Sequence, residues 1–343
     1  MSQNPPLLLL DEANLAPDGL LSPLAGLTDK PPVIHYQGRE YPLTDRHRII
    51  LTGNPDHYEG RHLDEALKTR VPTLFYHPLS KSVLVESIIH PGLPAYWSTE
   101  QKQQASERMF TLFNRFSQLV PGDLMTPRDI KDMLASIHQL LRYQPSQLMH
   151  SNDTISEQQI NALVHKAFID SLGGAVEGAQ QQQLASLNHW YQGQFLEDDS
   201  ILNGVNTVFS EFMEKLKQRN PEGDFGTEAV RKLVYSYWQS LEKDDSGRVS
   251  VLVEGTTGWG KDFILDRTIQ QWQLEQALHR PMTHINANIH QWPELVAKVH
   301  EAMIHGHILA ISELNLIPSH YLEGLFNDVL TGYAKSGFRL FAT

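Results

Sequence analysis

The feature that most constrains the fold is an internal repeat. Residues 7–17 (LLLLDEANLAP) match residues 308–318 (ILAISELNLIP) at a constant offset of 301 residues. A second pair of segments, 48–52 (RIILT) and 339–343 (RLFAT), also matches, after a connection that is ten residues shorter in the second copy. One repeat unit is therefore close to 300 residues long, and we expect this chain of 343 residues to contain two half-cores around a middle region.

The spacing of apolar residues predicts a chain of α/β character with a helical middle. Between about residues 81 and 241 the apolar positions recur at helical spacing, whereas Val249–Val253 is a continuous β-branched run that is typical of a strand buried on both faces. Further strands are predicted at 7–10, 33–36, 41–43, 48–52, 73–76, 283–286, 307–311 and 338–342, and further helices at 293–304 and 320–330.

Composition excludes several classes of function. The net charge of −12 gives no basic face for a phosphate backbone, so we expect no nucleic-acid partner. The chain contains no cysteine, which excludes disulfides, thiolate metal sites and a cysteine nucleophile. The longest apolar runs are far shorter than the roughly 18 residues of a membrane span, and we expect a cytoplasmic protein.

A glycine-rich segment after the predicted strand at 249–253 has the spacing of a phosphate-binding loop. Gly255, Gly258, Gly260 and Lys261 form the pattern G-x-x-x-x-G-K at the start of a predicted helix. Such a loop directs backbone N–H groups and the helix N-terminus toward phosphate oxygens, and the lysine reaches the terminal phosphates. The next residue is Asp262, where the motif has Ser or Thr as a magnesium ligand. The structural alternative is a fortuitous glycine-rich turn.

Carboxylates at the ends of two predicted strands suggest the rest of the site. Asp11 would hold Mg²⁺, and Glu12 would polarise the attacking water. The second copy retains the glutamate as Glu313 but has Ser312 in place of the aspartate. We therefore expect that Asp262 and Ser312 lie side by side and have exchanged carboxylate and hydroxyl, so that both stay candidate metal ligands. The alternative is a decayed site that binds nucleotide weakly or not at all.

The motifs in residues 5–175 and 226–343 resemble the AAA+ ATPases of the MoxR, dynein and midasin group. The resemblance lies in DEANLAP at 11–17, TGNP at 52–55, YEG at 58–60 and LDEALKTRV at 63–71. It implies that Asn54 is the sensor 1 residue, that Arg70 is an arginine finger for a neighbouring module, and that Arg128 is the sensor 2 residue. Each has a structural alternative: a cap of the turn before proline 55, a surface arginine, and an ordinary helix start at TPRD (126–129).

The resemblance implies an α/β P-loop (AAA+) architecture of half-modules that flank an all-helical lid and connector. The parts would be a C-terminal half-core at 1–79, a lid at 80–175, a connector at 176–245 and an N-terminal half-core at 246–343. It implies ATP and Mg²⁺ as cofactors, neighbouring AAA+ modules and a protein client as partners, and ATP hydrolysis coupled to mechanical remodelling of a protein complex. The alternative function is a non-hydrolysing module that acts as a structural or nucleotide-sensing part of a ring.

Neither nucleotide site is expected to be complete within this chain. The first copy has the carboxylates without a phosphate loop, and the second has the loop without sensor 1, lid or finger, so we expect weak or no ATPase activity of the chain alone. The first half-core would also lack its central strand. We therefore expect either self-association or a non-standard packing of the strands at 7–10, 48–52 and 73–76.

Overall fold

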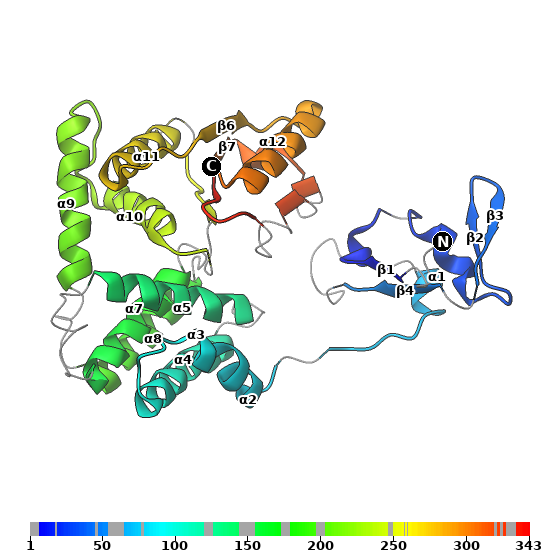
Figure 1. Cartoon of the computed structure of the whole chain (residues 1–343), viewed down its shortest axis with the longest axis horizontal. Helices are drawn as coiled ribbons and strands as arrows, with labels where there is room; N and C mark the ends of the chain where they lie inside the picture. The colour runs from blue at the N-terminus through cyan, green and yellow to red at the C-terminus, as the bar shows by residue number, and fades with distance from the viewer. Residues whose placement is uncertain are drawn as a thin grey trace. The chain divides into compact units, whose positions relative to one another are not determined.

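The computed structural model divides the chain into two compact units, residues 1–78 (unit 1) and 79–343 (unit 2) (Figure 1). Among the described residues, none of the helices combines the length and apolar character needed to cross a bilayer. The structure describes residues 7–17, 19–44, 47–53, 65–76, 79–119, 126–143, 155–172, 179–196, 203–245, 250–256, 258, 260–318, 321–322, 325–326 and 334–343.

Unit 1 contains a parallel strand pair and a separate hairpin. Strand β1 (Leu7–Leu10) pairs in parallel with β4 (Arg48–Leu51), and β2 (Val33–Tyr36) pairs antiparallel with β3 (Arg39–Pro42). The two hairpin turn residues, Gln37 and Gly38, have φ values of 50° and 72°, because a two-residue turn needs positive φ to follow the twist of its strands. The predicted hairpin is thus confirmed, with its second strand starting two residues earlier. Short helical segments at Ala13–Leu15, Ser22–Thr28 and α1 (Glu65–Lys68) complete the unit.

The strand predicted at 73–76 is wrong. These residues have no regular secondary structure, and the side chains of Leu74, Phe75 and Tyr76 are 93%, 80% and 88% exposed. A strand needs a neighbour to satisfy its backbone N–H and C=O groups, and this segment has no paired strand among the described residues. The pairing of β1 with β4 is, by contrast, regular, so of the three segments expected to pack in a non-standard way, only 73–76 departs from a paired strand.

Unit 2 begins with helices, as the apolar spacing predicts. A π-helical segment, Val85–Ile89, joins α2 to α3. The helix α5 begins with a capping box, in which Thr126 and Asp129 satisfy each other's backbone N–H groups. The helices are α2 (Lys81–Leu84), α3 (His90–Gly92), α4 (Thr99–Leu119), α5 (Pro127–Arg142), α7 (Glu157–Leu172), α8 (Ala179–Phe195), α9 (Asn203–Arg219) and α10 (Glu228–Glu242).

A four-stranded parallel sheet follows, with the strand order β5-β8-β7-β6. The fold of the described residues therefore combines many helices with parallel sheets, an α/β architecture. The predicted helix at 320–330 lies largely outside the described residues. The elements are β5 (Ser250–Leu252), α11 (Lys261–Gln276), β6 (Met282–Asn286), α12 (Trp292–His305), β7 (Ile308–Ser312) and β8 (Arg339–Ala342).

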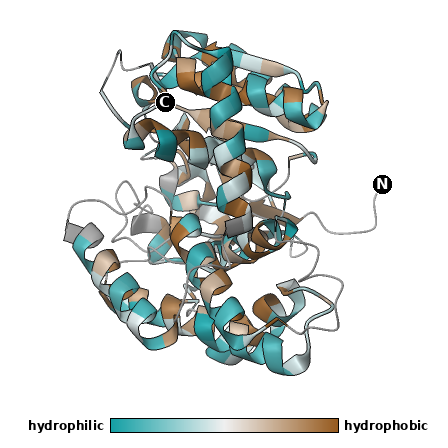
Figure 2. Cartoon of the chain, turned by 90° about the vertical axis from the view of Figure 1, so that its left-hand side faces the viewer, coloured by the Kyte–Doolittle hydropathy of each residue, from teal (hydrophilic) through white to brown (hydrophobic). Residues whose placement is uncertain are grey.

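The central strand β7 is buried along its whole length and contributes to two cores. Ile308 and Ala310 belong to the larger core, which also contains residues of α4, α5, α7, α8, α9, α10 and α11. Leu309 and Ile311 belong to the second core, which contains residues of α12. Successive side chains of a strand point to opposite faces, so one continuous apolar run supplies both cores. Figure 2 shows hydrophobic and hydrophilic residues side by side on the helices.

The side chain of Arg339 ties β8 to the end of α10. It is 3% exposed and donates hydrogen bonds to the carbonyls of Ser240 at 2.7 Å, Phe338 at 2.7 Å and Lys243. It also forms an ion pair with Asp245 at 2.8 Å. A guanidinium has five donors in a planar fork, so one buried side chain can satisfy several backbone acceptors at a helix end. This contact fixes the helical part of unit 2 to the sheet.

The two copies of the repeat have the same local structure. The register of β1 on β4, with Leu7 opposite Arg48, is equivalent to that of β7 on β8, with Ile308 opposite Arg339. The glutamates that follow both strands adopt the left-handed conformation, with φ of 53° at Glu12 and 59° at Glu313. Backbone hydrogen bonds also correspond, since Ala13 N donates to Thr52 O at 2.8 Å and Leu314 N donates to Thr343 O at 2.9 Å. The sequence repeat is therefore a structural repeat.

Candidate functional site

The glycine-rich segment connects β5 to α11 at one end of the parallel sheet of unit 2. Gly258 and Gly260 have φ values of 83° and 73°, a conformation that side chains other than glycine rarely adopt. Gly260 is the N-cap of α11, and Lys261 is its first residue. The Lys261 Nζ donates to the carbonyls of Gly255 at 2.7 Å and Thr256 at 3.2 Å. Residues 257 and 259 lie outside the described residues.

Asp262, in the first turn of α11, is in direct contact with the end of β7. The Ser312 Oγ donates to the Asp262 Oδ2 at 2.9 Å, and the Thr343 Oγ1 donates to the Asp262 Oδ1 at 2.9 Å. Ser312 is only 4% exposed. The side-by-side position expected for Asp262 and Ser312 is thus present. Whether these oxygens bind a metal stays a prediction.

One further side chain, His284, contacts this pair, and the charge of Asp262 acts on two others, Asp266 and Tyr237. The Nε2 atom of His284, on β6, lies 2.7 Å from the Ser312 Oγ, and since the serine hydroxyl donates to Asp262, the histidine is the donor. Burial raises the pKa of Asp266, and the charge of Asp262 raises it further, while His284 and Arg267 act in the opposite direction. Burial also raises the pKa of Tyr237, with a smaller contribution from the charge of Asp262.

Sequence reasoning did not select His284, Thr343, Asp266 or Tyr237. Two of them had a signal in the sequence. Asp266 lies one helical turn after Asp262, and Thr343 is the equivalent of Thr52 in the repeat. His284 and Tyr237 come from elements whose position beside the loop depends on the order of the strands and on the packing of α10, and no local pattern predicts either.

Glu313 follows β7 directly and is exposed at the end of the sheet. Its left-handed backbone costs about 1–2 kcal/mol for a residue with a Cβ atom. The same conformation at Glu12 shows that both copies hold a glutamate in this position. The conformation ends the strand and begins a turn of 3₁₀ helix in each copy.

The first copy places its aspartate beside the neighbouring strand. The Thr52 Oγ1 donates to the Asp11 Oδ1, and the backbone N–H of Glu12 donates to the same oxygen at 3.2 Å. In unit 1 the carboxylate of Asp11 directly follows β1 and the hydroxyl of Thr52 follows β4, whereas in unit 2 both strand ends supply hydroxyls and the carboxylate comes from α11. The strand-end carboxylate of the first copy is therefore a hydroxyl, Ser312, in the second.

The residues implied by the family resemblance occupy separate places. Asn54 lies outside the described residues. Arg70, in unit 1, is exposed and donates from Nη1 to the carbonyl of Ala25 at 2.9 Å. Arg128 is exposed in the first turn of α5 in unit 2, and its backbone N–H donates to the Thr126 Oγ1 at 3.2 Å. The helix-start interpretation of the TPRD segment thus accounts for its local structure, and the roles of all three residues in nucleotide chemistry stay predictions.

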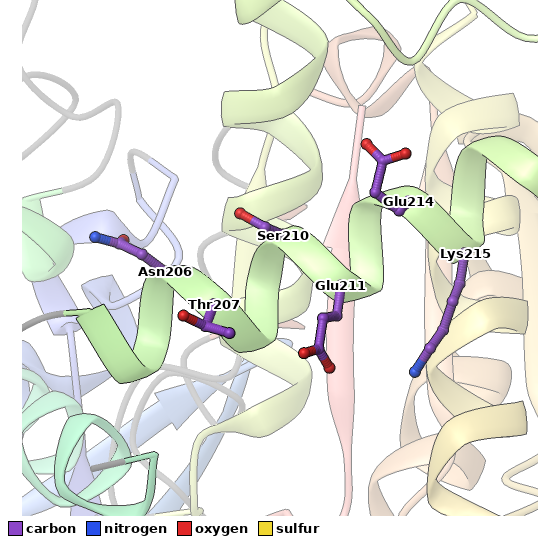
Figure 3. A pocket seen from close by; sticks show the side chains of 6 residues that line it. All are labelled: Asn206, Thr207, Ser210, Glu211, Glu214 and Lys215. Carbon is purple, nitrogen blue, oxygen red and sulfur yellow. The ribbon is translucent and has the colours of Figure 1, made fainter. Parts of the chain in front are cut away.

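A hollow of about 650 Å³ runs beside α9 and is remote in sequence from the phosphate-loop segment (Figure 3). Two of its side chains have partners on neighbouring helices, since Ser210 accepts a hydrogen bond from Arg231 at 3.1 Å and Lys215 pairs with Glu275 at 3.2 Å. It is a weaker candidate site, because its lining residues come from one helix and include no glycine-rich loop. The lining residues are Asn206, Thr207, Ser210, Glu211, Glu214 and Lys215.

The chain matches no protein-family model and no curated protein.

Proposed function

We propose that the segment from Gly255 to Asp262 binds ATP together with Mg²⁺, and that the chain belongs to a tandem AAA+ ATPase. In such a protein, nucleotide hydrolysis drives mechanical remodelling of a protein complex, with neighbouring AAA+ modules and a protein client as partners. The observation that carries the proposal is the hydrogen bond from Ser312 to Asp262 at 2.9 Å. It brings the end of β7, where Glu313 follows, beside the first turn after the glycine-rich loop.

The residues of the loop fit a triphosphate. The N-terminus of α11 carries unpaired backbone N–H groups and a partial positive charge, both of which favour phosphate oxygens. The two glycines with positive φ allow the backbone to curve around such a group. The Lys261 ammonium, which now contacts two carbonyls of its own loop, is long enough to turn toward the phosphates.

The oxygens around Asp262 fit Mg²⁺ bound jointly with phosphates. The described residues contain no group of three or more His, Asp or Glu side chains that could hold a metal ion alone. Mg²⁺ commonly uses one or two carboxylates and completes its shell with water and phosphate oxygens, and Asp262 with Ser312 supplies such a partial set. Bound there, the ion would neutralise phosphate charge, while Glu313 would orient the attacking water.

A second candidate is nucleotide binding without hydrolysis. It is favoured by the two hydroxyl groups that already occupy the Asp262 carboxylate, one on each oxygen. In this arrangement Asp262 and Ser312 satisfy each other without an ion, so nucleotide affinity would not depend on Mg²⁺. The first candidate requires that it does.

Nucleotide binding to the full chain tests the proposal. We would titrate a fluorescent ATP analogue in Mg²⁺ and in EDTA, with Lys261→Ala as the loop variant. Loss of one charged contact should weaken binding by about tenfold or more. Lys232→Ala is the matched control, because Lys232 is an exposed lysine of α10 that pairs with Glu228. Equal affinity of the wild type and Lys261→Ala would contradict the proposal, and equal affinity in Mg²⁺ and EDTA would favour the second candidate.

A double-mutant cycle at positions 262 and 312 tests whether Asp262 and Ser312 bind Mg²⁺ with carboxylate and hydroxyl exchanged. We expect Asp262→Thr and Ser312→Asp each to weaken Mg²⁺-dependent binding, because each leaves two like groups side by side. The double variant should restore it. Single changes that are harmless, or a double variant that is only additive, would show that the exchange has no part in metal binding. Hydrolysis by the isolated wild-type chain should be weak, and robust turnover by a monomer would overturn that expectation.

A further inference from the structure

Unit 1 exposes the apolar side chains that its structural equivalent in unit 2 buries. The difference is greatest on the face of the strands that, in unit 2, belongs to the larger core. The exposed side chains are Leu7 at 65%, Leu9 at 57% and Ile50 at 50%. Their equivalents Ile308, Ala310 and Phe341 are 0%, 1% and 0% exposed.

The second copy shows which elements cover this surface. The edge of β8 that faces away from β7 pairs in parallel with β5. The residue after β5, Val253, donates its N–H to the carbonyl of Ala342 at 2.9 Å. The ring of Tyr237, on α10, meets Phe341 edge-on at 5.5 Å. A strand that leads into the phosphate loop and the helices beside it therefore cover the face whose equivalent is exposed on β4 of unit 1.

The arginine at the start of the second strand supports the same equivalence. Arg339 and Arg48 each donate from Nη1 to the carbonyl of the preceding residue, at 2.7 Å and 2.9 Å. In unit 2 the guanidinium also reaches the carbonyls at the end of α10 and Asp245. Arg48, in contrast, is exposed. A helix end rich in carbonyl and carboxylate oxygens is the structure that this side chain fits.

The aspartate of unit 1 specifies the chemistry of the covering segment. In unit 2 the carboxylate of Asp262, on α11, accepts hydrogen bonds from the hydroxyls at the ends of β7 and β8. In unit 1 the residue that directly follows β1 carries the carboxylate, Asp11, which accepts a hydrogen bond from the hydroxyl of Thr52. By the same geometry, the residue opposite Asp11 should be a hydroxyl donor rather than a second carboxylate.

We propose that β1 and β4 form a docking surface for a partner segment built as a strand, a phosphate loop and a helix, with Ser or Thr at the position equivalent to Asp262. The partner strand pairs with the edge of β4 that faces away from β1, its helix packs over Leu7, Leu9 and Ile50, and its hydroxyl donates to Asp11.

A second copy of this chain does not fit the surface. In every copy the place between β5 and β6 is already filled by β7 and β8. If β1 and β4 took that place, Asp11 would replace Ser312 and meet the carboxylate of Asp262. Two carboxylates in one contact repel each other, so the two units of this chain are mismatched at this position.

The experiment adds a covering segment in the register that the repeat defines. A copy of residues 246–307 is joined directly to Leu7, in place of residues 1–6, because residue 307 precedes the equivalent of Leu7. One version of the added segment keeps the aspartate equivalent to Asp262, and the other has threonine there. Hydrogen exchange followed by mass spectrometry reports on residues 7–16 and 48–53. We expect the threonine version to slow exchange in both peptides by at least about 100-fold relative to the unextended chain.

The aspartate version should protect these peptides much less, and Asp11→Ser within it should restore protection by recreating the pair found in unit 2. The same Asp11→Ser change in the unextended chain should leave exchange of residues 48–53 fast. Equal protection by the two versions would overturn the hydroxyl requirement, and no protection by either, even with Asp11→Ser, would overturn the docking surface. Light scattering of the unextended wild type should show a monomer; a dimer with slow exchange in residues 7–16 would identify a second copy as the occupant and refute the proposal.

Discussion

Replacement of Arg339 by methionine should separate the sheet of unit 2 from the end of α10. Arg339 is buried and donates to the carbonyls of Ser240, Phe338 and Lys243 as well as to Asp245. Methionine approximates the length and volume of the side chain without any donor, so the substitution removes these bonds and leaves little empty space.

The expected loss in the free energy of unfolding follows from the carbonyl groups that lose their hydrogen-bond donor. Each of the three carbonyls loses a bond that is worth about 1 kcal/mol net, or more where the donor is charged. The Asp245 side chain is 40% exposed, so water screens its charge and its contribution is small. Arg339→Met should therefore lower the free energy of unfolding of unit 2 by about 3 kcal/mol.

Urea denaturation followed by tryptophan fluorescence measures this change in the full chain. All six tryptophans lie in unit 2, so the signal reports on that unit alone. Arg339→Lys keeps the charge but loses the fork of donors, and it should recover only part of the stability.

Arg219→Met is the matched control, because Arg219 is an exposed arginine at the end of α9. It should change the free energy of unfolding by less than about 0.5 kcal/mol. If Arg339→Met costs less than about 1 kcal/mol, or no more than the control, the hydrogen bonds of Arg339 do not hold the sheet to α10.

Three further changes have expected outcomes. Burial raises the pKa of Asp245, but hydrogen bonds from Ser336 and Arg339, among others, outweigh this effect and hold the pKa below its usual 3.8. The stabilisation by the Asp245 carboxylate should therefore be complete above pH 3.8 and lost as the pH falls through the lowered pKa. Urea titrations at several pH values should show the gap between wild type and Asp245→Asn closing at acid pH, and a constant gap would contradict this assignment. Thr126→Ala should cost about 1 kcal/mol by chemical denaturation, because the capping box with Asp129 is lost. Phe116→Ala should cost about 3–5 kcal/mol, since Phe116 is 1% exposed in the larger core, and a loss below 1 kcal/mol would place it outside that core.

Local patterns in the sequence predicted much of the secondary structure. The apolar spacing between residues 81 and 241 predicted helices, the TPRD segment predicted a helix start, and the continuous run at 249–253 predicted the strand β5. The expectation that this strand is buried on both faces was wrong, because β5 lies at the edge of the sheet and Leu252 is 62% exposed. These patterns succeed because the periodicities of 3.6 and 2 residues follow from backbone geometry within one segment. The segment at 73–76 has a similar apolar character, but the prediction of a strand there was wrong, because a strand exists only where another strand pairs with it.

The candidate site was predictable in part for a similar reason. The loop residues Gly258, Gly260 and Lys261 are close together in the chain, and the phosphate-loop fold that they suggest places Ser312 beside Asp262. His284 and Tyr237 could not be predicted, because they reach the site through a parallel sheet and a helix whose positions depend on contacts distant in sequence.

The sequence by itself determined the repeat, the segments that become helices and strands, and the residue types at each strand end. Only the tertiary structure decided the strand order β5-β8-β7-β6, which places Asp262 against Ser312 and Thr343. It also decided that the same apolar strand pair is buried in unit 2 and exposed in unit 1. The physical reason is that burial is a property of the neighbours that a segment finds in space, and two segments with matching residues can have different neighbours.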